Sequence, residues 1–255
     1  MMQVLVIETI ELVIALAILA FIATLRETKP VSDFFFADQK WTLSDAYKIL
    51  LPFAFAGFIL FWFVQILPKP SVHTRTVIDI GIYLVWCVGE FAIFWLVIKI
   101  PHKITASTFR LKKTEFLPAA VLPINVVTVL FLLAVRNPPQ PNAFLFQNVP
   151  ILLNLLLLVT VIFVCPPFEE LLWRGILYAP VIRRISKWQA IACLSLTESL
   201  LHMPETVEAL FWRFLGFLFR YFLYARNRSL YSPIIYHIGW NFVASRPHLK
   251  KLLSS

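Results

Sequence analysis

Long apolar runs are the feature that most limits how this chain can fold. Of its 255 residues, 60% are hydrophobic and 15% are charged, whereas soluble globular domains carry about 25% charged residues. A membrane-spanning helix needs about 20 consecutive apolar residues, and several runs approach or exceed that length. The sequence therefore predicts an all-α, polytopic membrane helix bundle of about eight transmembrane helices, expected near residues 4–25, 49–67, 77–98, 116–135, 151–182, 188–203, 207–225 and 231–244.

A segment rich in proline and asparagine, residues 137–150, follows the fourth run and is the best candidate for a boundary within the chain. We expect N-terminal membrane helices over residues 1–140. Residues 141–255 are expected to carry the chemistry and to complete the same membrane domain. The sixth and eighth runs are short for a hydrocarbon layer of about 30 Å. We expect them to pack inside the bundle or around a water-filled cavity, where short segments are tolerated.

The net charge of +9 does not indicate a nucleic-acid-binding protein, because most lysines and arginines lie in short segments between apolar runs. That distribution is typical of loops that face anionic lipid headgroups. The expected surroundings are therefore membrane lipid, and the expected localisation is a multi-pass integral membrane protein.

The stretch from Pro166 to Arg174 places charged residues between two apolar segments. Charges at membrane depth cost several kcal/mol unless they are paired or hydrated, so such residues are candidates for function. Glu170 and Arg174 are spaced i,i+4 with the acid first, which favours a structural ion pair within a helix. Glu169 projects about 100° away and is left free for chemistry. Pro166 and Pro167 are expected to interrupt the helix and to place both acids in the first turn of a new segment, where the helix dipole favours negative charge.

Two histidines, His202 and His237, lie in later apolar segments, and together with Glu169 they suggest a shared site. Glu198 precedes His202 by four residues, so its carboxylate could orient the imidazole or form an inert buried pair. His237 and Asn241 share a helix face and suit donation to a developing oxyanion. The imidazole also suits a metal, and both side chains suit plain interhelical hydrogen bonds.

Two arginines of the seventh run, Arg213 and Arg220, are seven residues apart and share a helix face. We expect them to form structural ion pairs or to extend towards the membrane interface. They are accordingly left outside the candidate site.

Three of these stretches together resemble the CPBP family of intramembrane proteases, which includes the type II CAAX prenyl endopeptidases and bacteriocin-processing or self-immunity proteins. The family motif Glu-Glu-x-x-x-Arg matches Glu169 to Arg174, and the motif His-x-x-x-Asn matches His237 to Asn241. The motif Phe-x-x-x-His is matched only at His202, because Glu198 stands in the place of the phenylalanine. The resemblance covers about residues 151–244.

The resemblance implies an endopeptidase that hydrolyses a peptide bond of a membrane-associated or lipidated peptide with an activated water, a prenylated substrate being one option. Glu169 would be the general base with His202 assisting, and His237 and Asn241 would stabilise the oxyanion. In a competing version Glu169, His202 and His237 hold Zn²⁺. Glu198 could join a metal site or mark an inactive member. A non-catalytic immunity or scaffold protein and an ion- or proton-coupled transporter are the alternatives.

Overall fold

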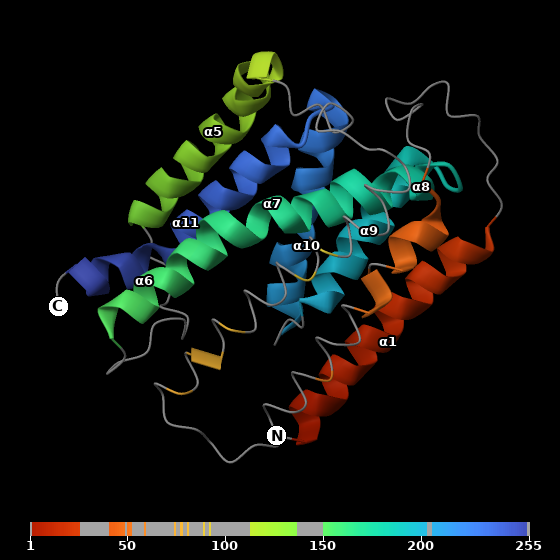
Figure 1. The fold of residues 1–255 in the computed structure, drawn as a ribbon, viewed down its shortest axis with the longest axis horizontal. Helices are drawn as coiled ribbons and strands as arrows, with labels where there is room; N and C mark the ends of the chain where they lie inside the picture. Colours follow the sequence, from red (N-terminus) through yellow and green to blue (C-terminus); the bar gives the residue numbers. More distant parts are fainter. Residues whose placement is uncertain are drawn as a thin grey trace.

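The computed structural model describes residues 2–25, 41–48, 50–52, 113–136, 150–202 and 206–253, and isolated positions between 59 and 92. Every regular element in these ranges is a helix, which confirms the predicted all-α class. Most of the second and third predicted runs and most of the segment 137–150 lie outside the described residues. The remaining six runs coincide with helices (Figure 1).

The helices flank one long central helix. They are α1 (Met2–Thr24), α5 (Lys113–Arg136), α9 (Lys187–Leu201), α10 (Val207–Asn227) and α11 (Tyr231–Leu253). α1 packs against α9, α10 packs against α9 and α11, and α5 runs alongside α11 (Figure 1). Helices from both predicted parts of the chain therefore pack together. The division at residue 140 itself stays a prediction.

The central helix runs from Ile151 to Ile182 through five segments that alternate between α- and π-helix. They are α6 (Ile151–Val159), η4 (Thr160–Val164), α7 (Cys165–Glu170), η5 (Leu171–Leu177) and α8 (Tyr178–Ile182). Within the described residues it is the one helix long and apolar enough to cross a membrane; Thr9–Thr24 and Phe116–Val129 are shorter apolar stretches. The count of eight crossings stays a prediction.

The expected break at the two prolines is wrong, because the helix continues through them. Pro166 and Pro167 occupy the first positions of α7, directly after the π-helical turns of η4. A proline's missing amide proton does least harm at the first helical positions. No acid lies in the first turn of α7, so the expected stabilisation of Glu169 and Glu170 by a helix dipole is also wrong. Their charges are compensated by side chains instead.

The helix at the eighth run is longer than expected. α11 has 23 residues, or about 34 Å at 1.5 Å per residue, and continues well past Ala244 into polar and basic residues that an apolar pattern does not count. The helix is therefore long enough to cross a membrane, but its apolar part is not longer than predicted, and among the described helices only the central one is also apolar enough to cross. α9, with 15 residues, is as short as predicted.

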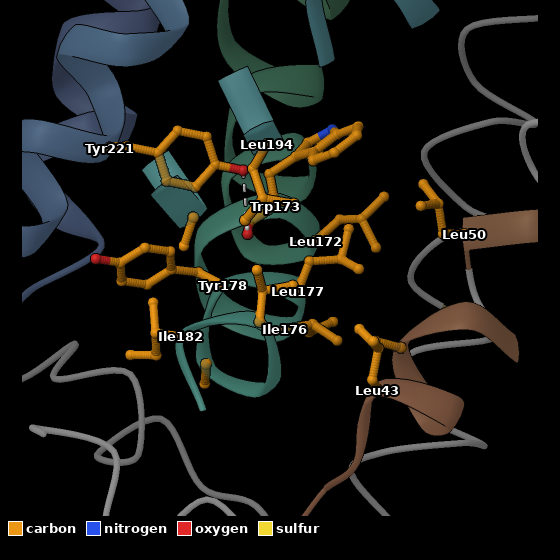
Figure 2. Packing of buried hydrophobic residues seen from close by; sticks show 14 of the residues in the cluster. Leu43, Leu50, Leu172, Trp173, Ile176, Leu177, Tyr178, Ile182, Leu194 and Tyr221 are labelled. Carbon is orange, nitrogen blue, oxygen red and sulfur yellow. Dashed lines mark hydrogen bonds between the residues drawn. The ribbon is translucent and has the colours of Figure 1, made fainter. Parts of the chain in front are cut away.

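The buried hydrophobic core forms around η5 and α8, with side chains from α1, α9 and α10. In Figure 2, Leu43 and Leu50 lie on one side of this helix, and Tyr178 and Tyr221 lie on the other. The Trp41 indole donates to the Ile176 carbonyl at 2.9 Å, which ties the segment before residue 43 to the π-helical stretch. The buried hydrophobic core thus packs around the part of the central helix that follows Glu169 and Glu170.

Gly239 lies where α11 meets α5, between His237 and Asn241. A Cβ atom added there would lie 2.4 Å from Val127 Cγ2 and 2.6 Å from its Cγ1. Ser232 strengthens the same contact by donating to the Ala119 carbonyl at 2.6 Å. The close approach of these helices, which fixes the position of the two motif residues, therefore needs a residue without a side chain.

We predict that Gly239→Ala destabilises the protein by about 1–3 kcal/mol, because Val127 is β-branched and α11 must shift to admit the methyl group. Unfolding of the purified protein in detergent measures this. Gly216→Ala in α10 is the matched control, since a Cβ there meets nothing within 4 Å. The double variant Gly239→Ala with Val127→Ala is expected to recover part of the loss, and no recovery would contradict the proposed clash.

Candidate active site

Four buried charged side chains from three helices form one network: Glu170, Arg174, Glu198 and Arg220. Arg174 lies at its centre. Its Nε is 3.2 Å from Glu170 Oε2, so the ion pair predicted from the i,i+4 spacing is present. Its Nη1 and Nη2 atoms each lie 2.7 Å from an oxygen of Glu198, in a two-point contact of the kind that a planar guanidinium favours.

Arg220 completes this buried charge network. Its Nη1 donates to Glu170 Oε1 at 2.8 Å, and its Nη2 lies 3.9 Å from Glu198 Oε1. Two guanidinium groups and two carboxylates thus balance, and their side chains are between 0% and 8% exposed. Because an unpaired buried charge costs several kcal/mol, each member holds the others in place. The network joins the central helix to α9 and α10.

Aromatic rings cover both guanidinium groups. The Arg174 Cζ atom lies 4.1 Å from the centroid of the Tyr221 ring, and the Arg220 Cζ atom lies 4.1 Å from that of Phe217. Arg174 also donates to the Phe217 carbonyl at 3.4 Å. In Figure 2 the Tyr221 hydroxyl points at the Trp173 carbonyl, at 3.5 Å. These cation–π contacts replace part of the hydration that the arginines lose on burial.

Glu169 faces away from the network and towards two imidazoles. Its Oε2 lies 3.7 Å from His202 Nε2 and 3.8 Å from His237 Nε2. The carboxylate comes from α7, His202 directly follows α9, and His237 lies on α11. The Glu169 side chain is 23% exposed whereas Glu170 is fully buried. The adjacent acids therefore have different surroundings, as their helical spacing predicts.

His202 is oriented by the main chain. Its Nδ1 lies 2.8 Å from the Glu198 carbonyl oxygen, which can only accept. The neutral ring therefore carries its proton on Nδ1 and presents the Nε2 lone pair to Glu169. Of the alternatives left open for Glu198, orientation of this ring by its carboxylate does not occur, because Arg174 holds that carboxylate in a buried pair.

His237 and Asn241 both use hydrogen bonds within the protein. His237 is buried, and its Nδ1 lies 2.8 Å from Glu170 Oε1 and 2.6 Å from Arg220 Nη1. Asn241 donates one amide proton to the Val161 carbonyl at 2.9 Å, which ties α11 to the π-helical segment η4. A role for Asn241 at an oxyanion therefore depends on its second amide proton.

Arg220 is the site residue that the sequence analysis missed. Its side chain is 8% exposed, pairs with Glu170 and contacts His237, so of the two expected roles the structural ion pair is confirmed and the extension towards the interface is wrong. Arg213 donates instead to the His202 carbonyl. A signal for Arg220 was available, since Glu198 adds a second buried acid that needs a second buried base.

The described residues contain no group of three or more His, Cys, Asp or Glu side chains arranged to hold a metal ion. Glu169 Oε2 does face both imidazoles, but at 3.7 and 3.8 Å these contacts alone do not define a coordination site. The geometry therefore gives no support to the metalloprotease version.

The described residues form an all-helical fold in which a glutamate and two histidines from three elements are turned towards one another. Residues 151–243 match the family model described as type II CAAX prenyl endopeptidase, Rce1-like, a family of membrane-integral endopeptidases. The resemblance inferred from the motifs is thereby confirmed. No curated protein and no solved structure matches the chain.

We predict that Arg174→Gln destabilises the protein by about 3–5 kcal/mol, because the change leaves two buried carboxylates to share one guanidinium. Denaturant unfolding in detergent measures the loss. Arg226→Gln, at an exposed position of α10, removes the same charge outside the network and is expected to leave the unfolding midpoint unchanged. Equal effects of the two substitutions would contradict the structural role of the network.

Proposed function

We propose that this protein is an intramembrane endopeptidase that hydrolyses a peptide bond of a membrane-associated or lipidated peptide with an activated water. The observation that carries the proposal is the difference between the adjacent acids. Glu170 is fully buried and held by two arginines, whereas Glu169 is partly exposed and faces His202 and His237. The family of residues 151–243 supports endopeptidase activity.

Glu169 is proposed as the general base. Its Oε2 is buried beside the Nε2 atoms of His202 and His237 and makes no hydrogen bond in the described part of the chain, so we propose that it takes its proton from a water held between these groups. The water oxygen then attacks the substrate carbonyl carbon, and the proton held by Glu169 passes to the nitrogen of the leaving amine as the carbon–nitrogen bond breaks. A positioned base of this kind contributes about 10²- to 10⁴-fold to the rate.

The histidines and Asn241 are proposed to support this step from two sides. His202 presents its Nε2 lone pair to Glu169 and can help to hold the attacking water. His237 and the second amide proton of Asn241 are proposed as donors to the oxyanion. Fixed donors act strongly where water is excluded, and His237 is 6% exposed.

The number of membrane crossings, the division of the chain and the substrate class are proposed from the apolar runs and the family match. We propose about eight membrane crossings, with N-terminal helices over residues 1–140 and the catalytic part over 141–255. The family supports a peptide or protein substrate in the membrane. A prenylated substrate is the first to test, because the matched family is that of CAAX prenyl endopeptidases.

Glu198 no longer favours a non-catalytic immunity or scaffold protein. Its carboxylate stands where the family has a phenylalanine, yet it is fully buried and bound by Arg174. It therefore does not disturb the contact between His202 and Glu169. No observation on the described residues favours a transporter.

We predict that Glu169→Gln lowers the cleavage rate by about 10²- to 10⁴-fold without unfolding the protein. The assay uses the purified protein in liposomes with a membrane-anchored peptide, in prenylated and unprenylated forms. Glu208→Gln is the matched control, because Glu208 is an exposed acid in the first turn of α10. Wild-type rates in a well-folded Glu169→Gln variant would disprove the assignment of the base.

The glutamate-base and zinc-dependent mechanisms predict different metal contents for the active protein, so a measurement of bound zinc decides between them. For the glutamate-base mechanism we expect the purified, active protein to contain much less than one zinc per chain and to remain active after chelation. Elemental analysis of the wild type and of His237→Ala measures this. One zinc per active chain, lost in His237→Ala, would instead establish Glu169, His202 and His237 as ligands.

A further inference from the structure

We propose that Arg220 is a positioning residue that holds His237 in the tautomer with its proton on Nε2, the ring nitrogen that lies 3.8 Å from Glu169 Oε2 and that would donate to the oxyanion. The catalytic consequence of this inference depends on the proposed endopeptidase function. The tautomer itself does not, and it can be measured without any cleavage.

Three atoms meet on the buried side of His237. Arg220 Nη1, Glu170 Oε1 and His237 Nδ1 lie 2.6 to 2.8 Å from one another. The shortest of the three distances, 2.6 Å, joins the guanidinium to the imidazole. His237 therefore faces an obligate donor and an obligate acceptor at the same ring nitrogen, and only one of them can be matched.

The donor determines the outcome. A guanidinium keeps all its protons and has no acceptor, so a proton on Nδ1 would place two N–H groups against each other at 2.6 Å. Glu170 does not need the imidazole, because its Oε1 accepts from Arg220 and its Oε2 contacts Arg174. An unprotonated Nδ1 accepts from Arg220, and the mismatch that remains, between Nδ1 and Glu170 Oε1 at 2.8 Å, is the longer of the two contacts.

The two histidines then present different groups to Glu169: His202 presents a hydrogen-bond acceptor, and His237 presents a hydrogen-bond donor. The Glu198 carbonyl fixes the proton of His202 on Nδ1, which leaves Nε2 as an acceptor. Arg220 fixes the proton of His237 on Nε2, which makes that atom a donor. An acceptor beside the base suits the attacking water, and a donor suits the oxyanion. A protonated Nε2 also has no lone pair for a metal, which fits the glutamate-base mechanism.

Glu198 is the reason that Arg220 can be buried at this point. Arg174 alone would balance Glu170, so a second guanidinium needs a second carboxylate. Glu198 supplies it through Arg174 and lies 3.9 Å from Arg220. Arg220 and Glu198 carry opposite charges, so substitution of both by neutral residues leaves the net charge of the network unchanged.

The test measures the tautomer of His237 directly. Protein labelled with ¹⁵N-histidine is reconstituted in lipid, and the His237 signals are assigned by comparison with His237→Gln. The key variant is the double substitution Arg220→Met with Glu198→Gln, which keeps the remaining Glu170–Arg174 pair in charge balance and so protects folding. Controls are Glu198→Gln alone, which leaves Arg220 in place, and Arg226→Met on the exposed face of the same helix.

In the wild type and both controls, we expect a protonated, pyrrole-type Nε2 and an unprotonated Nδ1. In the double variant, we expect the proton to move to Nδ1, where Glu170 accepts it. A wild-type ring with a protonated Nδ1, or a double variant with unchanged His237 signals, would overturn the proposal.

In the liposome assay, the double variant should lose about 10- to 100-fold in kcat with little change in KM, which is the size of effect found when the hydrogen-bond partner of a metal-binding histidine is removed. The variant Arg220→Lys with Glu198 unchanged has a hydrogen-bond donor at position 220. Compared with the double variant, it should recover part of the rate and the wild-type tautomer of His237. A lysine variant with the tautomer of the double variant would argue against donation as the role of Arg220. A wild type without any cleavage would refute the endopeptidase proposal and leave the tautomer result valid.

Discussion

The contact of Arg174 with two buried carboxylates is the interaction on which the rest of the site depends. The arginine lies on the central helix, and it binds one acid four residues earlier and another acid on α9. Charged groups without water are stable only when every partner is present. This requirement fixes the rotation of the central helix against its neighbours, and with it the direction in which Glu169 points. The carboxylate of Glu169 is thus oriented by buried ion pairs between the central helix and its neighbours.

The irregular course of the central helix serves the same end. Two π-helical segments flank α7, and each is held from outside, by Asn241 at the Val161 carbonyl and by Trp41 at the Ile176 carbonyl. π-Helical turns inside α-helices are frequent at functional sites. Here the helix continues through Pro166 and Pro167 without a break, and the two hydrogen bonds hold the π-helical segments on either side of the acids in place. The acids are therefore stabilised by tertiary partners and not by a helix end.

Much of this arrangement can be predicted from the sequence, and the failures have a common cause. Apolar runs give the helices of the described residues, and i,i+4 spacing gives the Glu170–Arg174 pair and the separate position of Glu169. The length of α11 and the continuity through Pro166 and Pro167 are missed, because hydropathy and proline rules do not register tertiary contacts. The partners of Glu198 and Arg220 are missed for the same reason, since they lie on different helices.

Glu198 shows how a departure from a motif can be read physically. A carboxylate in place of an apolar ring next to a catalytic histidine suggests either a metal site or a lost activity. The contacts support a third explanation, in which a second buried base accompanies the extra acid and the sum of charges is unchanged. The extra base then becomes available to act on His237. A change that adds one charge near a buried site is therefore best interpreted only after its counter-charge has been found, because the two together can add an orienting contact that neither residue provides alone.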